Sequence, residues 1–278
     1  MFHNDEVWSY VVFGDNYERY YLPLVHNISL AKQVGAKIII SIQYKDYYMI
    51  KDKSEWFQKH VMIIICSSPN SKKYPKLERV LNVQDVTSEY IFFKDSDSIV
   101  TKQELTIHKE WKEKSTQYPY LIIRNHPEHV APIMAGMFAV QLKKLPLLQS
   151  LINLSLTNQN MLIKLSSYAY DQQILARYVY PEIVSYSAVY TSHFAFVNEH
   201  VFLLQHCVKN HIGSYFLEEE AKHNVLSSLI NFCYRGGLLY SPFFHKYPQL
   251  HQKTVPSILI ARVYTFFISL RRFFCEHK

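Results

Sequence analysis

The sequence predicts an α/β fold with a mostly parallel, Rossmann-like sheet flanked by helices. Two observations predict it. Short runs of β-branched and aromatic residues alternate with a longer segment of helical spacing, as in a βαβ unit. The runs are also apolar throughout instead of alternating with polar residues, which is typical of strands buried on both faces. They cover residues 8–13, 37–42, 61–66 and 90–93.

The first three elements form the expected βαβ unit. Residues 8–13 (WSYVVF) are a β-rich run that ends at Gly14-Asp15-Asn16. Residues 17–34 carry apolar side chains at roughly helical spacing, and residues 37–42 (KIIISI) form a continuous apolar strand. A parallel sheet therefore begins here, and the later runs extend it.

Two polar turns follow strand ends. Gly14-Asp15-Asn16 comes after the first strand, and Asp95-Ser96-Asp97 comes just after residues 90–93. Ligands of open α/β sheets bind beyond the carboxyl ends of the strands. Both turns are therefore expected at the ligand-binding edge of the sheet.

Length and composition are those of one globular domain with a tail. The 278 residues are enough for a large core, and we expect a main domain over 1–250 and a helix over 251–278. The formal charge of +7 favours anionic partners such as nucleotides, phospholipid surfaces or nucleic acid. Four scattered cysteines without a C-x-x-C pair argue against a zinc knuckle or a disulfide framework, and the first residues do not read as a secretory leader. A reducing, cytoplasmic location is expected.

Asp95 and Asp97 are the strongest candidate site residues. A buried strand would deliver both carboxylates to the rim of the sheet, where they would repel one another and raise each other's pKa. A hard divalent cation such as Mg²⁺ or Mn²⁺ relieves this repulsion and can bridge to phosphates. Lys94 beside them is a candidate phosphate partner. The alternative is a polar turn in which Asp97 caps the helix that starts near Thr101.

Three stretches carry a family resemblance: ERVLNVQDVTSEYIFFKDSDSIVTKQE, LIIRNHPEHVAPIMAGMFAVQ and YAYDQQILARYVYPEI. Together they resemble bacterial polysaccharide and lipopolysaccharide glycosyltransferases of GT-A fold, over roughly residues 8–200. A looser similarity to the retaining family 8 glycosyltransferases lies in FGDNY, the D-x-D, an Ala-Gly pair, DQQIL and NHIG. Departures from these patterns are Asn125 in place of an acid, Ala135 in place of a glycine, and a missing Lys-Pro-Trp ending after the family 8 histidine.

The resemblance implies a hexosyltransferase that uses a nucleotide-sugar, UDP-sugar above all, and Mn²⁺ or Mg²⁺. Asp97 would bind the metal directly, and Asp95 would reach the metal or the donor. The implied metal ligands are Asp95, Asp97 and His211. The residues expected to hold the nucleotide-sugar are Phe13, Gly14, Asp15, Asn16, Tyr17, Arg79, Lys94, Asp95, Arg124, Asn125 and Gly136.

Some of these residues have plainer readings. Asp15 or Asn16 could be an ordinary helix N-cap, which is compatible with a role at the base and ribose. Arg79 matches a basic position that steadies phosphates in similar enzymes, and the alternative is a surface arginine. Gly136, beside Ala135, would allow close backbone approach to a sugar.

The catalytic residues implied by the resemblance are Asp171, Gln172 and His126. In similar enzymes the acid that corresponds to Asp171 faces the acceptor, so it is expected to bind the acceptor or act as a general base. His126 would contact the donor sugar or the acceptor. The alternatives are a helix-dipole role for Asp171 and a simple turn before Pro127. Retention of anomeric configuration is implied by the looser similarity alone.

The C-terminal tail predicts a basic amphipathic helix. Arg262, Thr265, Ser269 and Arg272 share one face, and apolar residues cover the rest. Such a helix could lie at the inner face of the cytoplasmic membrane, or pack on the domain or in a homo-oligomer interface. The expected partners are therefore a nucleotide-sugar and an oligosaccharide or lipid-linked acceptor, with peripheral membrane contact as one use of the helix.

Two other functions compete. A nucleic-acid-binding protein would also be basic and aromatic, but the lysines are dispersed and no recognised motif appears, so we expect no nucleic acid partner. A metal-dependent nucleotidyltransferase or phosphatase could also use a close acid pair. Nucleotidyltransferases, however, expect a glycine-rich phosphate loop, and the six glycines of this chain form none.

Overall fold

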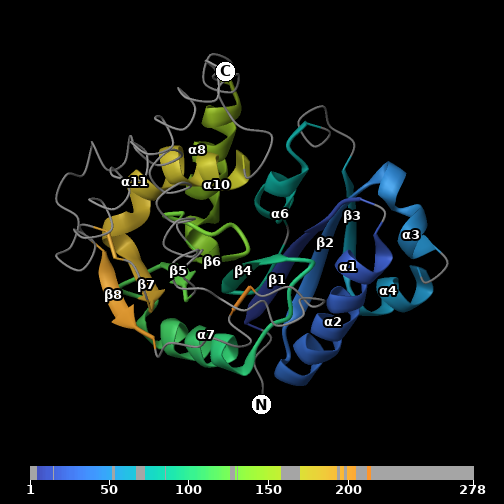
Figure 1. Ribbon diagram of the computed structural model, residues 1–278, viewed down its shortest axis with the longest axis horizontal. Helices are drawn as coiled ribbons and strands as arrows, with labels where there is room; N and C mark the ends of the chain where they lie inside the picture. The colour runs from blue at the N-terminus through green and yellow to red at the C-terminus, as the bar shows by residue number, and fades with distance from the viewer. Residues whose placement is uncertain are drawn as a thin grey trace, which may run out of the picture.

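The computed structural model describes the chain over residues 5–14, 16–51, 54–66, 73–84, 86–125, 129, 131–157, 170–192, 195–196, 199–204 and 212–213. An eight-stranded sheet forms its centre, in the order β3-β2-β1-β4-β6-β5-β7-β8 (Figure 1). The strands are β1 (Glu6–Val12), β2 (Lys37–Gln43), β3 (Met62–Cys66), β4 (Tyr90–Asp95), β5 (Tyr120–Arg124), β6 (Met137–Gln141), β7 (Ser187–Thr191) and β8 (His200–Leu203).

The sheet is mostly parallel. β6 runs antiparallel to both of its neighbours, β4 and β5, whereas the other neighbouring pairs among the described strands are parallel. The chain moves outward from β1 to β2 and β3, and then returns to place β4 on the other side of β1. This reversal of direction places a switch point at the carboxyl ends of β1 and β4, which is the usual ligand position in open α/β sheets.

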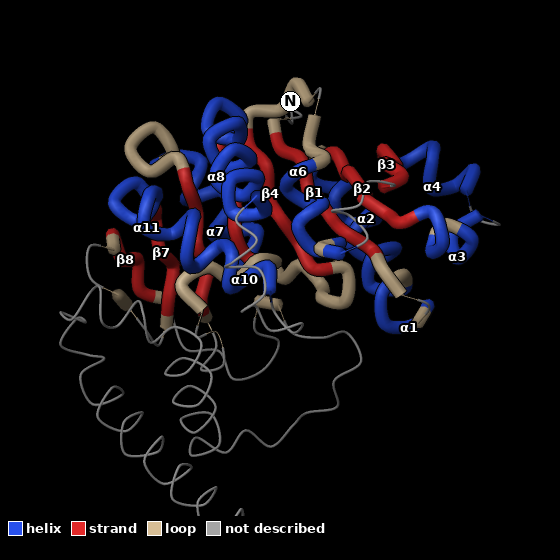
Figure 2. The backbone as a smooth tube through the Cα atoms, turned by 90° about the horizontal axis from the view of Figure 1, so that it is seen from above, coloured by secondary structure: helices blue, strands red, loops and turns tan. Residues whose placement is uncertain are grey.

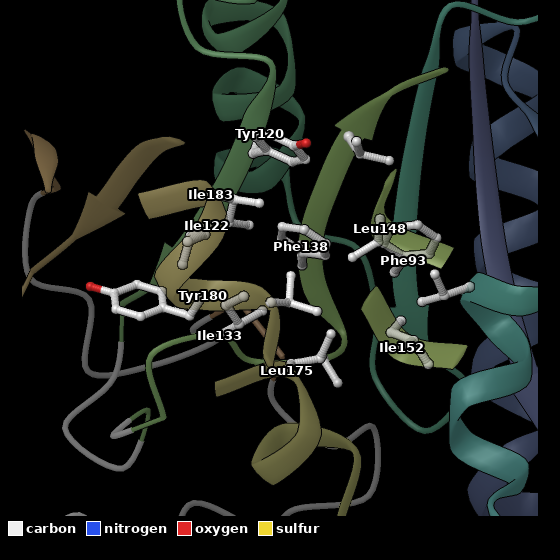
Figure 3. Packing of buried hydrophobic residues seen from close by; sticks show 14 of the residues in the cluster. Phe93, Tyr120, Ile122, Ile133, Phe138, Leu148, Ile152, Leu175, Tyr180 and Ile183 are labelled. Carbon is white, nitrogen blue, oxygen red and sulfur yellow. The ribbon is translucent and has the colours of Figure 1, made fainter. Parts of the chain in front are cut away.

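Helices cover both faces of the sheet (Figure 2). On one face α2, α4 and α7 pack over the side chains of Trp8, Ile40 and Phe92. On the other face α6, α8, α10 and α11 pack over Phe93, Phe138 and their neighbours. Figure 3 shows the part of this layer that α8 and α11 contribute. The helices are α1 (Tyr17–Tyr20), α2 (Leu22–Val34), α3 (Tyr48–Lys51), α4 (Ser54–His60), α6 (Glu78–Leu81), α7 (Lys102–Lys114), α8 (Leu145–Thr157), α10 (Tyr170–Ile174) and α11 (Tyr180–Ile183).

Local sequence signals set the C-terminal end of α2 and the N-terminal end of α7. α2 ends at Gly35, whose φ of 77° is the left-handed conformation that glycine adopts without strain. α7 begins after Thr101, whose hydroxyl accepts a hydrogen bond from Glu104 N at 3.2 Å. Thr101, not Asp97, is therefore the N-cap of α7, so the plain capping reading of Asp97 is wrong.

The predicted fold class is confirmed in its mostly parallel sheet flanked by helices. The predicted helix over 17–34 is interrupted at Tyr21, where α1 ends and α2 begins at a Pro-containing first turn. The strand predicted over 90–93 continues through Asp95, so the first acid of the pair belongs to the strand itself. The tail over 251–278 lies outside the described residues. Within the described part of the chain, no helix has both the length and the apolar character needed to span a bilayer.

Candidate functional site

The acidic pair lies at the switch point of the sheet. Asp95 is the last residue of β4 and stands opposite Val11 of β1, and Asp97 follows in the turn beyond the strand. The Asp95 side chain is 44% exposed, whereas that of Asp97 is 15% exposed. The pair therefore sits at the carboxyl rim predicted for it, with Asp97 the more enclosed of the two.

The surroundings of Asp97 disfavour the charged form of its carboxyl group. Burial and the neighbouring Asp95 raise its pKa to about 6, because both disfavour the charged form. Arg19 of α1 offsets part of this effect, with Nη2 at 3.4 Å from Asp97 Oδ2. The charged form of Asp97 is therefore still disfavoured with Arg19 beside it. A bound divalent cation would favour that form.

Arg79 organises the acids of the site. Its side chain is 3% exposed, and its Nη1 donates to Asp95 Oδ1 at 2.5 Å and to the carbonyl oxygen of Lys94 at 3.1 Å. Its Nη2 lies 3.5 Å from Oδ2 of Asp171. Burial alone would lower the pKa of Arg79, but the Asp95 and Asp171 carboxylates raise it, so the guanidinium stays charged. Arg79, which is expected to steady a phosphate, thus contacts two carboxylates in the described structure.

Gly136 makes room for Asp95. A Cβ built on this glycine would lie 2.0 Å from Asp95 Oδ2 and 2.9 Å from Asp95 N, both far inside van der Waals contact. The residue precedes β6, which pairs with β4, so the close approach is fixed by the sheet. Here the glycine allows close approach to the acidic strand end.

Lys94 points away from the acidic pair. Along β4, Ile91 and Phe93 face α6 and α8, while Phe92 and Lys94 face α7. The Lys94 ammonium is 5% exposed and forms an ion pair with Glu104, and it lies 3.0 Å from His108 Nε2. The structure thus gives Lys94 a structural partner on the opposite face in place of the expected phosphate.

That buried cluster has strongly perturbed acidities. Burial would raise the pKa of Glu104, but Lys94 and His108 lower it to about 2. Burial and the Lys94 charge lower the pKa of His108 to about 4, so the imidazole is neutral near pH 7. The cluster ties β4 to α7 beneath the acidic turn.

The turn after β1 contains a glycine in the left-handed region and an N-capping asparagine. Gly14 has a φ of 90°, and the rings of Phe13 and Tyr20 lie 5.9 Å apart. Asn16 is the N-cap of α1, because its Oδ1 accepts from Arg19 N at 2.9 Å, and Tyr17 is the first residue of that helix. Asp15 lies outside the described residues. This turn and the acidic turn follow neighbouring strands, so both belong to the same edge of the sheet.

The polar residues after β5 are enclosed. Arg124 is fully buried and pairs with Oε2 of Glu199 at 2.5 Å, and its guanidinium lies 4.7 Å from the Phe196 ring. The Asn125 amide, in the orientation that satisfies both of its ends, donates to Ile212 O at 3.2 Å and accepts from Ile212 N at 2.9 Å. Gly213 follows with a φ of 82° and packs against Met137. The expected donor contacts Arg124 and Asn125 are therefore engaged with the later part of the chain.

Two further expected site residues, like Asp15, have no description. His126 and His211 lie outside the described residues. Gln172 is half-buried in α10. Asp171 in the same helix is 4% exposed, and its Oδ1 accepts no hydrogen bond from the described residues. That oxygen is an acceptor for which the described part of the chain supplies no donor.

The residues at the rim fit a divalent metal by their chemistry. Carboxylate oxygens are the ligands that Mg²⁺ and Mn²⁺ prefer, and Asp97 carries a charge that burial opposes. Among the described residues, no group of three or more His, Cys, Asp or Glu side chains is arranged to hold an ion. Any third protein ligand would thus come from elsewhere in the chain, as the expected role of His211 requires.

Sequence reasoning missed three residues that shape the site. Arg19 pairs with Asp97, Glu199 pairs with Arg124, and Asn27 binds the backbone of the acidic turn. None of them lies near its partner in sequence, and none belongs to a motif. The one local sequence signal near the acidic turn is the T-x-x-E capping pattern at Thr101. It predicts the start of a helix and none of these three contacts.

A groove lies at the other end of the strands. It has a volume of about 690 Å³ and is lined by the amino-terminal residues of β1, β2 and β3, with Lys32, Lys59 and His60 among the lining residues. Lys32 and Lys59 occupy the last turns of α2 and α4, where cations complement the helix C-terminus, and His60 lies beside Lys59 with its Nδ1 2.6 Å from Trp56 O. That local role accounts for them, and we place the candidate site at the acidic rim.

Comparisons with known proteins return structures but no sequence relatives. No protein-family model matches the chain, and no curated protein resembles it significantly. A glycosyltransferase involved in glycosylation of the major capsid of PBCV-1 is 16% identical, with a TM-score of 0.42, 66% of this chain and 80% of that chain covered. A mannosyltransferase of Pyrobaculum calidifontis, solved with GDP-Man and Mn²⁺, is 10% identical, with a TM-score of 0.46 and coverages of 96% and 75%.

A nucleotide-handling enzyme of another class is similar to the same degree. The 4-diphosphocytidyl-2C-methyl-D-erythritol synthase of Anaerococcus prevotii is 12% identical, with a TM-score of 0.45 and coverages of 84% and 98%. Likenesses of this order decide nothing about activity. The functional assignment therefore depends on the chemistry of the rim itself.

Proposed function

We propose that the protein is a metal-dependent glycosyltransferase that moves a sugar from a nucleotide-sugar to a glycan or lipid-linked acceptor. One observation carries the proposal: Asp95 and Asp97 stand together at the switch point of the sheet, and burial raises the pKa of Asp97 to about 6. The charged form of such a carboxyl group is disfavoured unless a cation binds beside it. A pyrophosphate-bearing substrate is the natural partner of such a cation at a strand end.

The donor side of the site is built from β1, α1 and β4. Asp97, with Asp95, would hold Mn²⁺ or Mg²⁺, which when bound offsets negative charge on the departing nucleoside diphosphate. Gly14, Asn16 and Tyr17 would receive the base and ribose. UDP-sugar is the donor that we assign, on the motif resemblance alone.

Arg79 has a positioning role in this proposal. Arg79 binds Oδ1 of Asp95. The other oxygen, Oδ2, lies next to Gly136 at the start of β6. The second contact of Arg79 fixes Asp171 on α10. One buried cation thereby keeps the donor-side and acceptor-side carboxylates at a constant separation.

Asp171 carries the acceptor side. Its Oδ1 is buried and accepts no hydrogen bond from the described residues, and we assign this oxygen to an acceptor hydroxyl that would enter the site beside it. A carboxylate in this position can orient the hydroxyl or take its proton. Gln172 and His126 are assigned to the same side, and His211 to the metal, on the motif resemblance. The same resemblance supports a place in bacterial surface-polysaccharide or lipopolysaccharide synthesis.

The test is a product assay. The protein is incubated with a set of nucleotide-sugars, each with and without Mn²⁺, and the released nucleotide is identified. We expect metal-dependent release of nucleoside diphosphate together with transfer of the sugar to an added glycan or lipid-linked acceptor. Release of pyrophosphate from a nucleoside triphosphate, with a sugar phosphate as co-substrate, would instead assign the site to a nucleotidyltransferase.

A further inference from the structure

Asn27 of α2 reaches the backbone of the acidic turn. Its Nδ2 donates to the carbonyl oxygen of Ser98 at 2.8 Å, and its Oδ1 accepts from Val100 N at 3.0 Å. The residue is fully buried. A single amide thus satisfies one donor and one acceptor of the turn that carries Asp97, although it lies far away in the sequence.

Both hydrogen bonds are costly to lose. A buried backbone group left without a partner destabilises the structure, and the Ser98 carbonyl oxygen and Val100 N would each lose the partner that Asn27 supplies. Ser98 Oγ donates to Asp95 O at 3.2 Å, which links the same turn back to the end of β4. The path of residues 95–100 is therefore fixed at one end by β4 and at the other end by Asn27.

The same helical segment also contacts the side chain of the acid. Arg19 of α1, which begins directly after the Gly14 turn, lies 3.4 Å from Asp97 Oδ2. α1 leads through Tyr21 into α2, so one continuous segment holds the acidic turn by its backbone and by its carboxylate. Arg19 is half-exposed and its pair with Asp97 is long, whereas the contacts of Asn27 are short and buried.

We propose that Asn27 is the positioning residue of the metal-binding turn, and that its two backbone hydrogen bonds set the affinity of the Asp95–Asp97 site for a divalent cation. This inference rests on the proposed function and adds the residue that organises the site from outside the motif. On this inference, Asp97 binds the ion only when the backbone of residues 98–100 has the conformation that Asn27 stabilises.

The test replaces Asn27 by two residues and measures the Kd for Mn²⁺ alone by electron paramagnetic resonance of the free ion. Asn27→Ser is neutral and loses both bonds to the turn. Asn27→Asp keeps the acceptor for Val100 N but sets a carboxylate against the Ser98 carbonyl oxygen. We expect at least a tenfold rise in Kd for both variants at pH 8.

The Asp variant adds a readout that a general loss of stability would not produce. A protonated carboxyl group can donate to Ser98 O and accept from Val100 N, as the amide does. The ratio of its Kd to that of the wild type should therefore fall toward one between pH 8 and pH 5.5. The ratio for Asn27→Ser is the reference for this change and should stay constant, because the serine side chain has no group that titrates in this range.

Asn82→Asp serves as the matched control. The Asn82 amide also joins distant elements, with Nδ2 at 3.4 Å from Ser41 Oγ and 2.9 Å from Cys66 Sγ, but it makes no contact with the acidic turn in the described structure. Its Kd for Mn²⁺ should match the wild type. Wild-type binding with equal affinity in folded Asn27→Ser would overturn the inference and leave the proposed function standing. A wild-type chain that binds no Mn²⁺ would overturn the proposed function, and the inference with it.

Discussion

Arg79 and Asp171 lie in contact across the site, with Nη2 of the arginine 3.5 Å from Oδ2 of the acid, and both side chains are almost fully buried. The same guanidinium binds Asp95 on β4. A strand end and the first turn of α10 are thereby held together by one cation. This relationship explains how two acids from distant parts of the sequence share one rim.

Replacing Arg79 should therefore destabilise the protein strongly. Arg79→Met leaves the buried Asp171 carboxylate uncompensated and removes donors from the carbonyl groups of Lys76 and Lys94. We expect a loss of about 3–5 kcal/mol in the free energy of unfolding. In an Asp171→Asn background the same change should cost about 1–3 kcal/mol less, because the buried charge is gone. Urea denaturation of the four proteins measures this cycle, and additive losses would rule out the coupling.

Asp97 should make the metal-free protein less stable as the pH rises. Its folded-state pKa of about 6 exceeds the ordinary value of 3.8, so the folded state binds the proton more tightly than the unfolded state. Stability from this group is therefore present at low pH and declines between about pH 4 and pH 6. Relative to wild type, Asp97→Asn should gain about 2 kcal/mol between pH 4 and pH 7 in EDTA. Unfolding curves at several pH values test this, and a gap independent of pH would contradict it.

Gly136→Ala should disrupt the acidic pair more than the fold. The added Cβ would overlap the Asp95 carboxylate, which must move, and overpacking of this kind costs about 1–3 kcal/mol. We expect Mn²⁺ affinity to fall at least tenfold, as measured by calorimetry. Gly35→Ala is the matched control, because it strains the left-handed end of α2 at a cost of about 1 kcal/mol but lies away from the rim. Equal Mn²⁺ affinity in the two variants would refute the steric argument.

Lys94 provides a test of the division between the two faces of β4. Lys94→Met alone removes the charged partner of the buried Glu104 carboxylate, leaving only His108 beside it, and should cost about 3–5 kcal/mol of stability. The double variant with Glu104→Leu removes both charges and should recover most of that loss. Because the ammonium faces α7, nucleotide affinity should be unchanged in the double variant. Weaker nucleotide binding there, in a protein of wild-type stability, would return Lys94 to the phosphate role first expected of it.

The pH dependence of the wild type contains a second component from this cluster. The pKa of Glu104 is lowered to about 2, so the stability that its ion pair contributes is present above the ordinary carboxyl range and is lost as the pH falls toward 2. This trend is opposite in sign to that of Asp97. The double variant at Lys94 and Glu104 should lose the acid-side decline and keep the decline between pH 4 and pH 6.

The position of the acidic pair could be predicted because it follows from local pattern alone. An apolar run long enough for a buried strand, followed by two acids, places Asp95 and Asp97 at the rim whatever the rest of the chain does. The direction of Lys94 also follows from strand alternation, since Phe93 and Asp95 lie on one face and Lys94 must lie on the other. The expected phosphate contact of Lys94 does not take this alternation into account.

The partners of Arg79, Asn27 and Arg124 could not be predicted in the same way. Each makes its contact with an element distant in sequence, and the contact depends on strand order and helix packing. The antiparallel β6 is a further case, because its apolar residues read equally well as a strand of either direction. The order of the strands and the packing of the helices decide these features, and neither can be predicted from a local sequence pattern.

The central claim is that the two aspartates after β4 hold a divalent cation. The most direct measurement is a crystal structure of the protein grown or soaked with Mn²⁺ and UDP, with anomalous data collected near the manganese absorption edge. We predict an anomalous peak bonded to the carboxylate of Asp97, in contact with the diphosphate, and its absence in Asp97→Asn. Ordered UDP at the carboxyl rim with no anomalous peak beside Asp97 would contradict the account.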